Sequence, residues 1–102
     1  MNLGSAIKMI RKEKNIGQKE MSGRTGLSVN ALSMIETNTS FPHKQTIEKI
    51  AAALDVPVSY LLFFSMSGDD VPQEKRELFN HLNAAIRSLL IDDLHKKDTG
   101  AP

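Results

Sequence analysis

One short segment, residues 29–36, combines an amide, a hydroxyl and two apolar side chains at a spacing that suits contact with base edges. In a helix, its outward side carries Val29, Asn30, Ser33 and Met34. An asparagine amide can pair with N6 and N7 of adenine, and valine or methionine can contact the thymine methyl group. Because no arginine lies on this side, strong guanine recognition is not expected. The segment therefore predicts a preference for A·T pairs.

The residues before this segment have the spacing of a helix-turn-helix. Gln18 opens a helix over residues 18–25, and the small Ser22 follows on the side that meets the next helix. Gly26 comes where the chain must turn, because glycine readily adopts the positive φ of such a turn. Leu32 lies six residues further, on the inner side of the second helix. The second helix of such a motif enters the major groove, so the spacing predicts double-stranded DNA as a partner.

The charge is divided unevenly along the 102 residues, although the net charge is only +1. Residues 1–50 hold eight Lys/Arg and four Asp/Glu, a net of +4, and residues 51–102 hold five and eight, a net of −3. The basic half contains the helix-turn-helix spacing. A local positive surface favours phosphate contact, because binding releases condensed counterions.

Helical periodicity and turn residues predict the elements around this motif. Ser28 is a good N-cap for the helix at 29–36. The other expected helices cover residues 3–14, 44–54 and 58–64, with a loop at 37–42. Beyond a linker, Pro72 and two glutamates suit the start of one long amphipathic helix over about 73–95.

The long C-terminal helix carries a narrow apolar stripe that must be buried against something. The stripe consists of Leu78, Phe79, Leu82, Ile86, Leu89 and Leu90. It can pack on its own domain in a monomer, or pair with the same helix of a second chain. Pairing explains more, because a two-fold dimer reads two half-sites about 34 Å apart. We therefore expect a homodimer.

Residues 3–64 resemble the phage-repressor-like (Xre-type) helix-turn-helix proteins. The resemblance is carried by Ile10-Arg11, Gln18, Gly26-Leu27-Ser28, Ile35-Glu36, Pro42 and Ile50-Ala-Ala-Ala-Leu54. It implies an all-α fold, a five-helix repressor-like domain over residues 1–66. A linker at 67–72 and the C-terminal helix at 73–97 would follow it.

The resemblance also implies roles for individual residues. The positions of Val29, Asn30 and Met34 would approach base edges. Phosphate contacts would come from Gln18, Ser28, Asn38, Thr39 and Lys44, and the pair Arg11 and Glu36 would tie the first helix to the end of the third.

Two positions depart from the family pattern. Asn38 stands where glycine is usual, and asparagine tolerates the left-handed turn next best. Ser22 replaces the usual alanine, and we expect its hydroxyl to bond a carbonyl one turn earlier.

Several classes of protein fit the sequence poorly. There is no cysteine for a disulfide or thiolate site, and the three histidines lack metal-ligand spacing. The longest apolar stretch is too short for a membrane span, and the N-terminus has no signal pattern. No catalytic signature is visible. We expect no cofactor, no small-molecule ligand and no membrane association, and a cytoplasmic location.

These observations favour a sequence-specific regulator of transcription, a repressor that binds a palindromic operator as a homodimer. The alternative is an antitoxin-like or anti-repressor module, which would bind another protein through its C-terminal helix. An enzyme is the third and least supported class.

Overall fold

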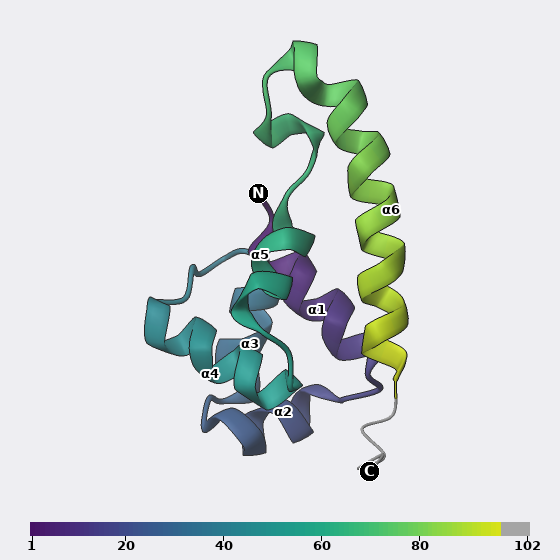
Figure 1. Cartoon of the computed structure of the whole chain (residues 1–102). Helices are drawn as coiled ribbons and strands as arrows, with labels where there is room; N and C mark the ends of the chain where they lie inside the picture. Colours follow the sequence, from purple (N-terminus) through teal and green to yellow (C-terminus); the bar gives the residue numbers. More distant parts are fainter. Residues whose placement is uncertain (97–102) are drawn as a thin grey trace.

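The computed structural model describes residues 1–96, which form six α-helices and two short 3-10 helices (Figure 1). These are α1 (Leu3–Glu13), α2 (Gln18–Thr25), α3 (Val29–Glu36), α4 (Lys44–Leu54), α5 (Val58–Ser65), η1 (Gly68–Asp70), η2 (Gln73–Lys75) and α6 (Arg76–His95). No strand occurs among the described residues. The prediction of an all-α fold, five helices followed by one long helix, is confirmed.

Helix α1 lies at the centre of the bundle and packs against α3, α4, α5 and α6. Its apolar residues recur at helical spacing and leave almost no surface exposed. The largest fully buried side chains come from five different helices, and they are Ile7, Ile10, Met21, Leu32, Ile50, Leu54 and Leu61. This one core fixes α2 and α3 relative to the rest of the chain.

A close approach of backbones holds the start of α1 against the end of α3. Gly4 is buried, and a Cβ atom there would collide with the carbonyl oxygen of Ile35 and lie 2.7 Å from Oδ1 of Asn38. Only glycine lets the two helices come so close. This close approach was not predicted, because it depends on residues more than 30 positions apart in sequence.

The predicted boundaries differ from the structure mainly at the C-terminal helix. It begins at Arg76 instead of residue 73, because Gln73–Lys75 form a 3-10 turn after Pro72. Pro72 itself is extended, with ψ at 147°, so it precedes the helix and is not part of its first turn. Helix α1 ends at Glu13 and α5 at Ser65, each one residue from the prediction. The helix ends at His95, as the periodicity predicts, and residue 97, the expected end of the whole C-terminal segment, lies outside the described residues.

After the linker, α6 runs back beside α1, and its last turns dock on the domain (Figure 1). Leu94 is buried in the common core. The Tyr60 hydroxyl donates to Oδ2 of Asp93 at 2.8 Å, which raises the pKa of the tyrosine. Nε2 of His95 lies 3.2 Å from Oε2 of Glu13. Thus α6 packs on its own chain along one side.

Candidate nucleic-acid interface

The turn between α2 and α3 is braced by several hydrogen bonds. Gly26 has φ of +78°, and its N–H donates to the Ser22 carbonyl at 2.9 Å. The Thr25 hydroxyl donates to the Met21 carbonyl at 2.7 Å and accepts from the Leu27 N–H at 3.1 Å. The geometry at Gly26 therefore matches what its spacing predicts.

Ser22 bonds differently from the expectation. Its hydroxyl donates to the carbonyl of Leu27 at 2.6 Å, so the prediction of a carbonyl one turn earlier was wrong. Leu27 has left the helix and its carbonyl has no helical partner, whereas the carbonyls within α2 are largely taken up by its own ladder. The serine thus ties α2 to the segment that leads into α3.

Helix α3 begins at the predicted cap. The Oγ atom of Ser28 accepts a hydrogen bond from the Ala31 N–H at 3.0 Å, which satisfies one of the donors left open at a helix start. Along the helix, Leu32 and Ile35 are buried and face the core. The inner side of α3 is therefore held firmly.

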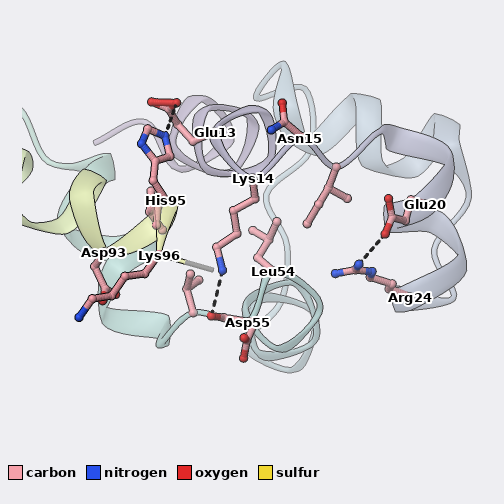
Figure 2. Close-up of a pocket in the computed structure, with 13 residues that line it drawn as sticks. Glu13, Lys14, Asn15, Glu20, Arg24, Leu54, Asp55, Asp93, His95 and Lys96 are labelled. Atoms are coloured by element: carbon pink, nitrogen blue, oxygen red, sulfur yellow. Dashed lines mark hydrogen bonds and ion pairs between the residues drawn. The ribbon is translucent and has the colours of Figure 1, made fainter. Parts of the chain in front are cut away.

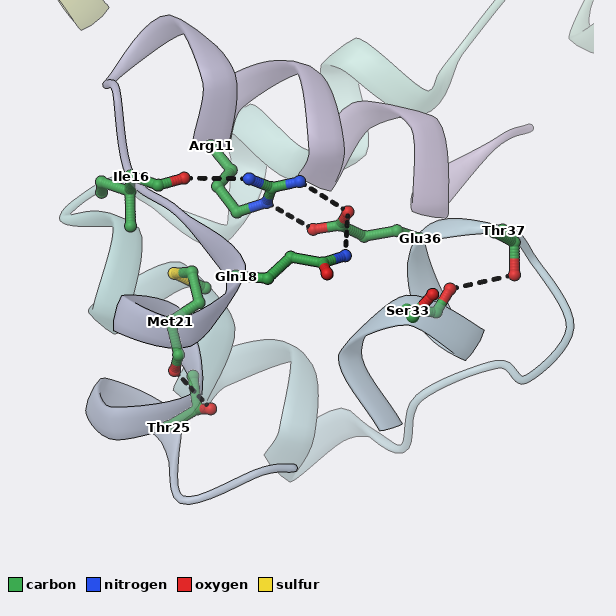
Figure 3. Close-up of polar contacts among 8 residues, drawn as sticks. All are labelled: Arg11, Ile16, Gln18, Met21, Thr25, Ser33, Glu36 and Thr37. Carbon is green, nitrogen blue, oxygen red and sulfur yellow. Dashed lines mark hydrogen bonds and ion pairs between the residues drawn. The ribbon is translucent and has the colours of Figure 1, made fainter. Parts of the chain in front are cut away.

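The outer side of α3 is open to solvent. Val29 and Met34 are 42% and 38% exposed, and Asn30 is exposed beside them. The Asn30 amide nitrogen lies 3.8 Å from the Met34 sulfur, a weak contact. Ser33 is half-buried at the edge of this surface, and its carbonyl accepts a hydrogen bond from the Thr37 hydroxyl at 2.9 Å (Figure 3). The four residues predicted to contact bases thus share this side of the helix.

A buried ion pair fixes the end of α3 against α1 (Figure 3). Nε and Nη2 of Arg11 lie 2.7 Å and 2.9 Å from the two carboxylate oxygens of Glu36, and both side chains are buried. Nη1 of Arg11 donates to the Ile16 carbonyl at 2.9 Å. Hydrogen bonding to Glu36 raises the pKa of Arg11, so the guanidinium stays charged. The pair joins α1, α3 and the loop before α2.

Comparison with known proteins identifies this arrangement. A family model described as a helix-turn-helix domain matches residues 4–63. The chain belongs to the helix-turn-helix domain family. The match covers more than half of the 102 residues, from the first turn of α1 into the last turn of α5.

Several curated proteins are similar to this helix-turn-helix region. The HTH-type transcriptional regulator SinR of Bacillus subtilis is 41% identical over 61 residues, which cover 59% of this chain and 55% of SinR. The immunity repressor protein of Bacillus phage phi105 is 36% identical over 62 residues, 61% of this chain and 43% of the repressor. The chain thus spans about half the length of these relatives. No solved structure matches.

The residues predicted to contact phosphate lie around the helix-turn-helix, but they differ in what they already bond. The Gln18 amide donates to Oε1 of Glu36 at 3.2 Å (Figure 3). Asn38 has φ of +60°, and its side chain accepts from the Gly4 N–H at 3.1 Å and donates to Oδ1 of Asn2 at 2.6 Å. Asn38 therefore points toward the start of α1, where it braces the turn.

Two other phosphate candidates lie at the surface after α3. Thr39 is exposed, with its hydroxyl 2.9 Å from the Thr37 hydroxyl and its N–H bonded to the Met34 carbonyl at 2.9 Å. Lys44 is exposed and opens α4.

Phe41 was not predicted as a site residue. It is 72% exposed, the highest value among the described exposed large apolar side chains. Its loop is tied to α3, because the Ser40 N–H bonds the Met34 carbonyl at 3.1 Å, and the following Pro42 is buried. The sequence does contain one indication of an exposed contact residue here, because an aromatic side chain stands next to proline inside a polar loop.

The predicted apolar stripe of α6 divides into two sides. Leu78, Leu82, Ile86 and Leu89 are between 43% and 67% exposed. Phe79 and Leu90 are half-buried, and Leu90 packs against the core. On that packed side, the Arg87 guanidinium lies 5.1 Å from the centre of the Phe64 ring.

A cleft of about 790 Å³ lies where the ends of α1, α4 and α6 approach α2 (Figure 2). Several of its charged side chains bond within the chain. Lys14 Nζ donates to the Asp55 carbonyl at 3.3 Å, and Arg24 donates to the Ala53 carbonyl at 2.8 Å and pairs with Glu20. These contacts join helix ends, so we assign the cleft a structural role.

In residues 1–96, no three His, Cys, Asp or Glu side chains are grouped to hold a metal ion. Within the same part of the chain, no helix is long and apolar enough to span a membrane.

Proposed function

We propose that this protein is a sequence-specific DNA-binding regulator of transcription, a repressor that binds a palindromic operator as a homodimer. The observation that carries the proposal is the division of α3 into a clamped side and an open side. Leu32 and Ile35 are buried, while Val29, Asn30 and Met34 face solvent. A helix that is fixed in this way can enter the major groove without first having to be ordered.

Base contacts would come from the open side of α3. The Asn30 amide can form two hydrogen bonds to adenine, and Val29 and Met34 can contact thymine methyl groups. Ser33 can bond an acceptor at the edge of the surface. This set of side chains favours A·T pairs.

Contacts beside α3 would set the position of the protein on the duplex. Gln18, Ser28 and Lys44 belong to the first residues or cap of α2, α3 and α4, where backbone N–H groups favour anions. The Thr39 hydroxyl can donate to a phosphate from the loop after α3. Asn38 would mainly brace the turn, because its side chain already bonds Gly4 and Asn2. Phe41 would add an apolar contact with a sugar or a thymine methyl.

Repression and dimerisation are supported by different observations. The similar phage phi105 protein is named an immunity repressor, and occupation of a promoter by such a protein would exclude polymerase. The exposed apolar residues of α6 support association of two chains, which a palindromic site requires.

Selection of bound duplexes from a random pool tests the proposal. We expect enrichment of an inverted repeat with A·T pairs at contacted positions and half-site centres one helical turn apart. No enrichment, or binding without sequence preference, would contradict it. Purification with a non-identical chain that covers α6 would instead favour the anti-repressor or antitoxin class.

A further inference from the structure

We propose that α6 pairs with α6 of a second copy in antiparallel orientation, with Leu78 of one chain opposite Leu89 of the other. The inference rests on the homodimer proposed above and specifies its geometry. It follows from three features of the helix: the side left exposed, the sizes of the residues on it and the charges at its two ends.

The exposed side of α6 has coiled-coil spacing. Leu78, Leu82, Ala85 and Leu89 are separated by four, three and four residues, and all are exposed. This repeat is the one that allows two helices to interlock side by side. Ile86 is exposed at the edge of the same side. Leucines exposed in a row are uncommon on a free monomer surface, which indicates a partner.

The contacts of α6 with its own chain leave this side clear. Asn83, Arg87, Leu90 and Leu94 lie on a neighbouring side of the helix and are half-buried or buried. The linker approaches the same side near the start of the helix, where Arg76 Nε donates to the Gly68 carbonyl at 2.7 Å. A second helix can therefore lie along the leucines without displacing the domain.

The sizes of the four residues favour the antiparallel orientation. In that register Leu78 meets Leu89, and Leu82 meets Ala85, so each layer contains at least one leucine. A parallel pair would place Ala85 against Ala85, which leaves a poorly filled layer, and Leu82 against Leu82. In the antiparallel pair every layer contains a leucine, so the helices keep an even separation. The parallel pair has an alanine layer between leucine layers and therefore leaves larger voids.

The charges at the two ends favour the same orientation. Lys75, directly before α6, and Asp92, near its end, continue the repeat by three residues on either side, and both are exposed. The antiparallel register places Lys75 opposite Asp92 of the second copy. A parallel pair would bring lysine to lysine and aspartate to aspartate, and both contacts are repulsive.

Disulfide crosslinking of the 102-residue chain tests this geometry, because the chain has no cysteine of its own. Two variants are made, Leu78→Cys and Leu89→Cys, both at exposed positions. In the antiparallel pair the two cysteines of different variants are adjacent, whereas two copies of residue 78 lie roughly 16 Å apart along the axis. A disulfide needs Cα atoms within about 7 Å.

We expect a mixture of the two variants to form the mixed disulfide and each variant alone to remain uncrosslinked. Ala84→Cys, exposed on another side of α6, is the matched control for random collision. Crosslinking of each variant with itself would overturn the orientation while the dimer stands. A dimer in sedimentation without any crosslink would overturn the use of this side. A monomer would overturn both the inference and the dimer proposed above.

A charge exchange gives an independent readout. Asp92→Lys should weaken dimerisation roughly two- to fivefold, because each Lys75 then faces another cation. The double variant Lys75→Glu with Asp92→Lys should restore it. Unchanged dimerisation in the single variant, or no recovery in the double variant, would count against the antiparallel register.

Discussion

Glu36 is the residue on which the position of α3 depends most directly, because its carboxylate holds Arg11 and accepts from Gln18. Glu36→Gln removes the charge that compensates a buried guanidinium. We expect a loss of about 3 kcal/mol in the free energy of unfolding, measured by denaturant titration.

The exposed pair of Glu20 and Arg24 provides the control. Glu20→Gln should cost less than about 1 kcal/mol, since solvent screens that pair. Equal losses in the two variants would show that burial of the Arg11–Glu36 pair has no special effect.

Asn30 is the only amide on the open side of α3. Asn30→Ala should lower discrimination at one A·T pair by about 1–3 kcal/mol and leave the melting temperature nearly unchanged. Binding to the selected duplex and to single-base variants of it, followed by fluorescence anisotropy, measures this. Unaltered discrimination would exclude Asn30 from base recognition.

Phe41 is an exposed aromatic residue of the loop after α3 that was not predicted to contact DNA. Because its side chain is 72% exposed, Phe41→Ala should leave stability within about 0.5 kcal/mol of the parent chain. We expect several-fold weaker DNA binding from the lost apolar contact. Leu62→Ala, at an exposed position on α5, is a control that should bind DNA as the parent does.

At the scale of elements, the packing of α1 on α3 depends on the missing side chain at Gly4. Gly4→Ala would push the added methyl into the Ile35 carbonyl, and we expect a destabilisation of about 1–3 kcal/mol. Gly23→Ala, in α2, meets nothing within 4 Å and should be neutral or slightly stabilising. Comparison of the two unfolding curves separates crowding from the general effect of removing a glycine.

The first five helices were predictable because their signals are local. Gly26, the Ser28 cap and the apolar periodicity all lie within a few residues of the boundaries that they determine. The 3-10 turn before α6 was not predictable from the sequence. Proline at position 72 is compatible with the first turn of a helix and with an extended backbone. Local sequence does not distinguish the two.

The positions of the site residues were predictable only in part. The open side of α3 follows from helical periodicity, and the structure keeps its four residues together. The partners of Gln18 and Asn38 depend on Glu36, Asn2 and Gly4, which are distant in sequence. Such contacts arise from the tertiary fold, which periodicity does not describe.

For the whole molecule, operator binding and association of two chains should be linked. Leu82→Glu places a charge in the proposed contact between two α6 helices while leaving α3 unchanged. We expect its affinity for a palindromic duplex to fall by at least tenfold and its affinity for a single half-site to stay the same. Sedimentation of the free protein should show a smaller mass than for the parent chain.

If the variant binds the palindrome as well as the parent does, α6 does not join the helix-turn-helix regions of two chains. Ala84→Glu, exposed on another side of the same helix, should retain parental binding and serves as the comparison.

The burial of Leu94 has a consequence for how such proteins diversify. The family match ends at residue 63, yet this leucine from the last turn of α6 completes the interior of the matched region. A tail grafted from a relative would leave that interior incomplete unless it supplied a side chain of similar shape at the same place. A change on the inward side of α6 therefore disturbs the core of the helix-turn-helix region, whereas a change on its outward side leaves that core intact.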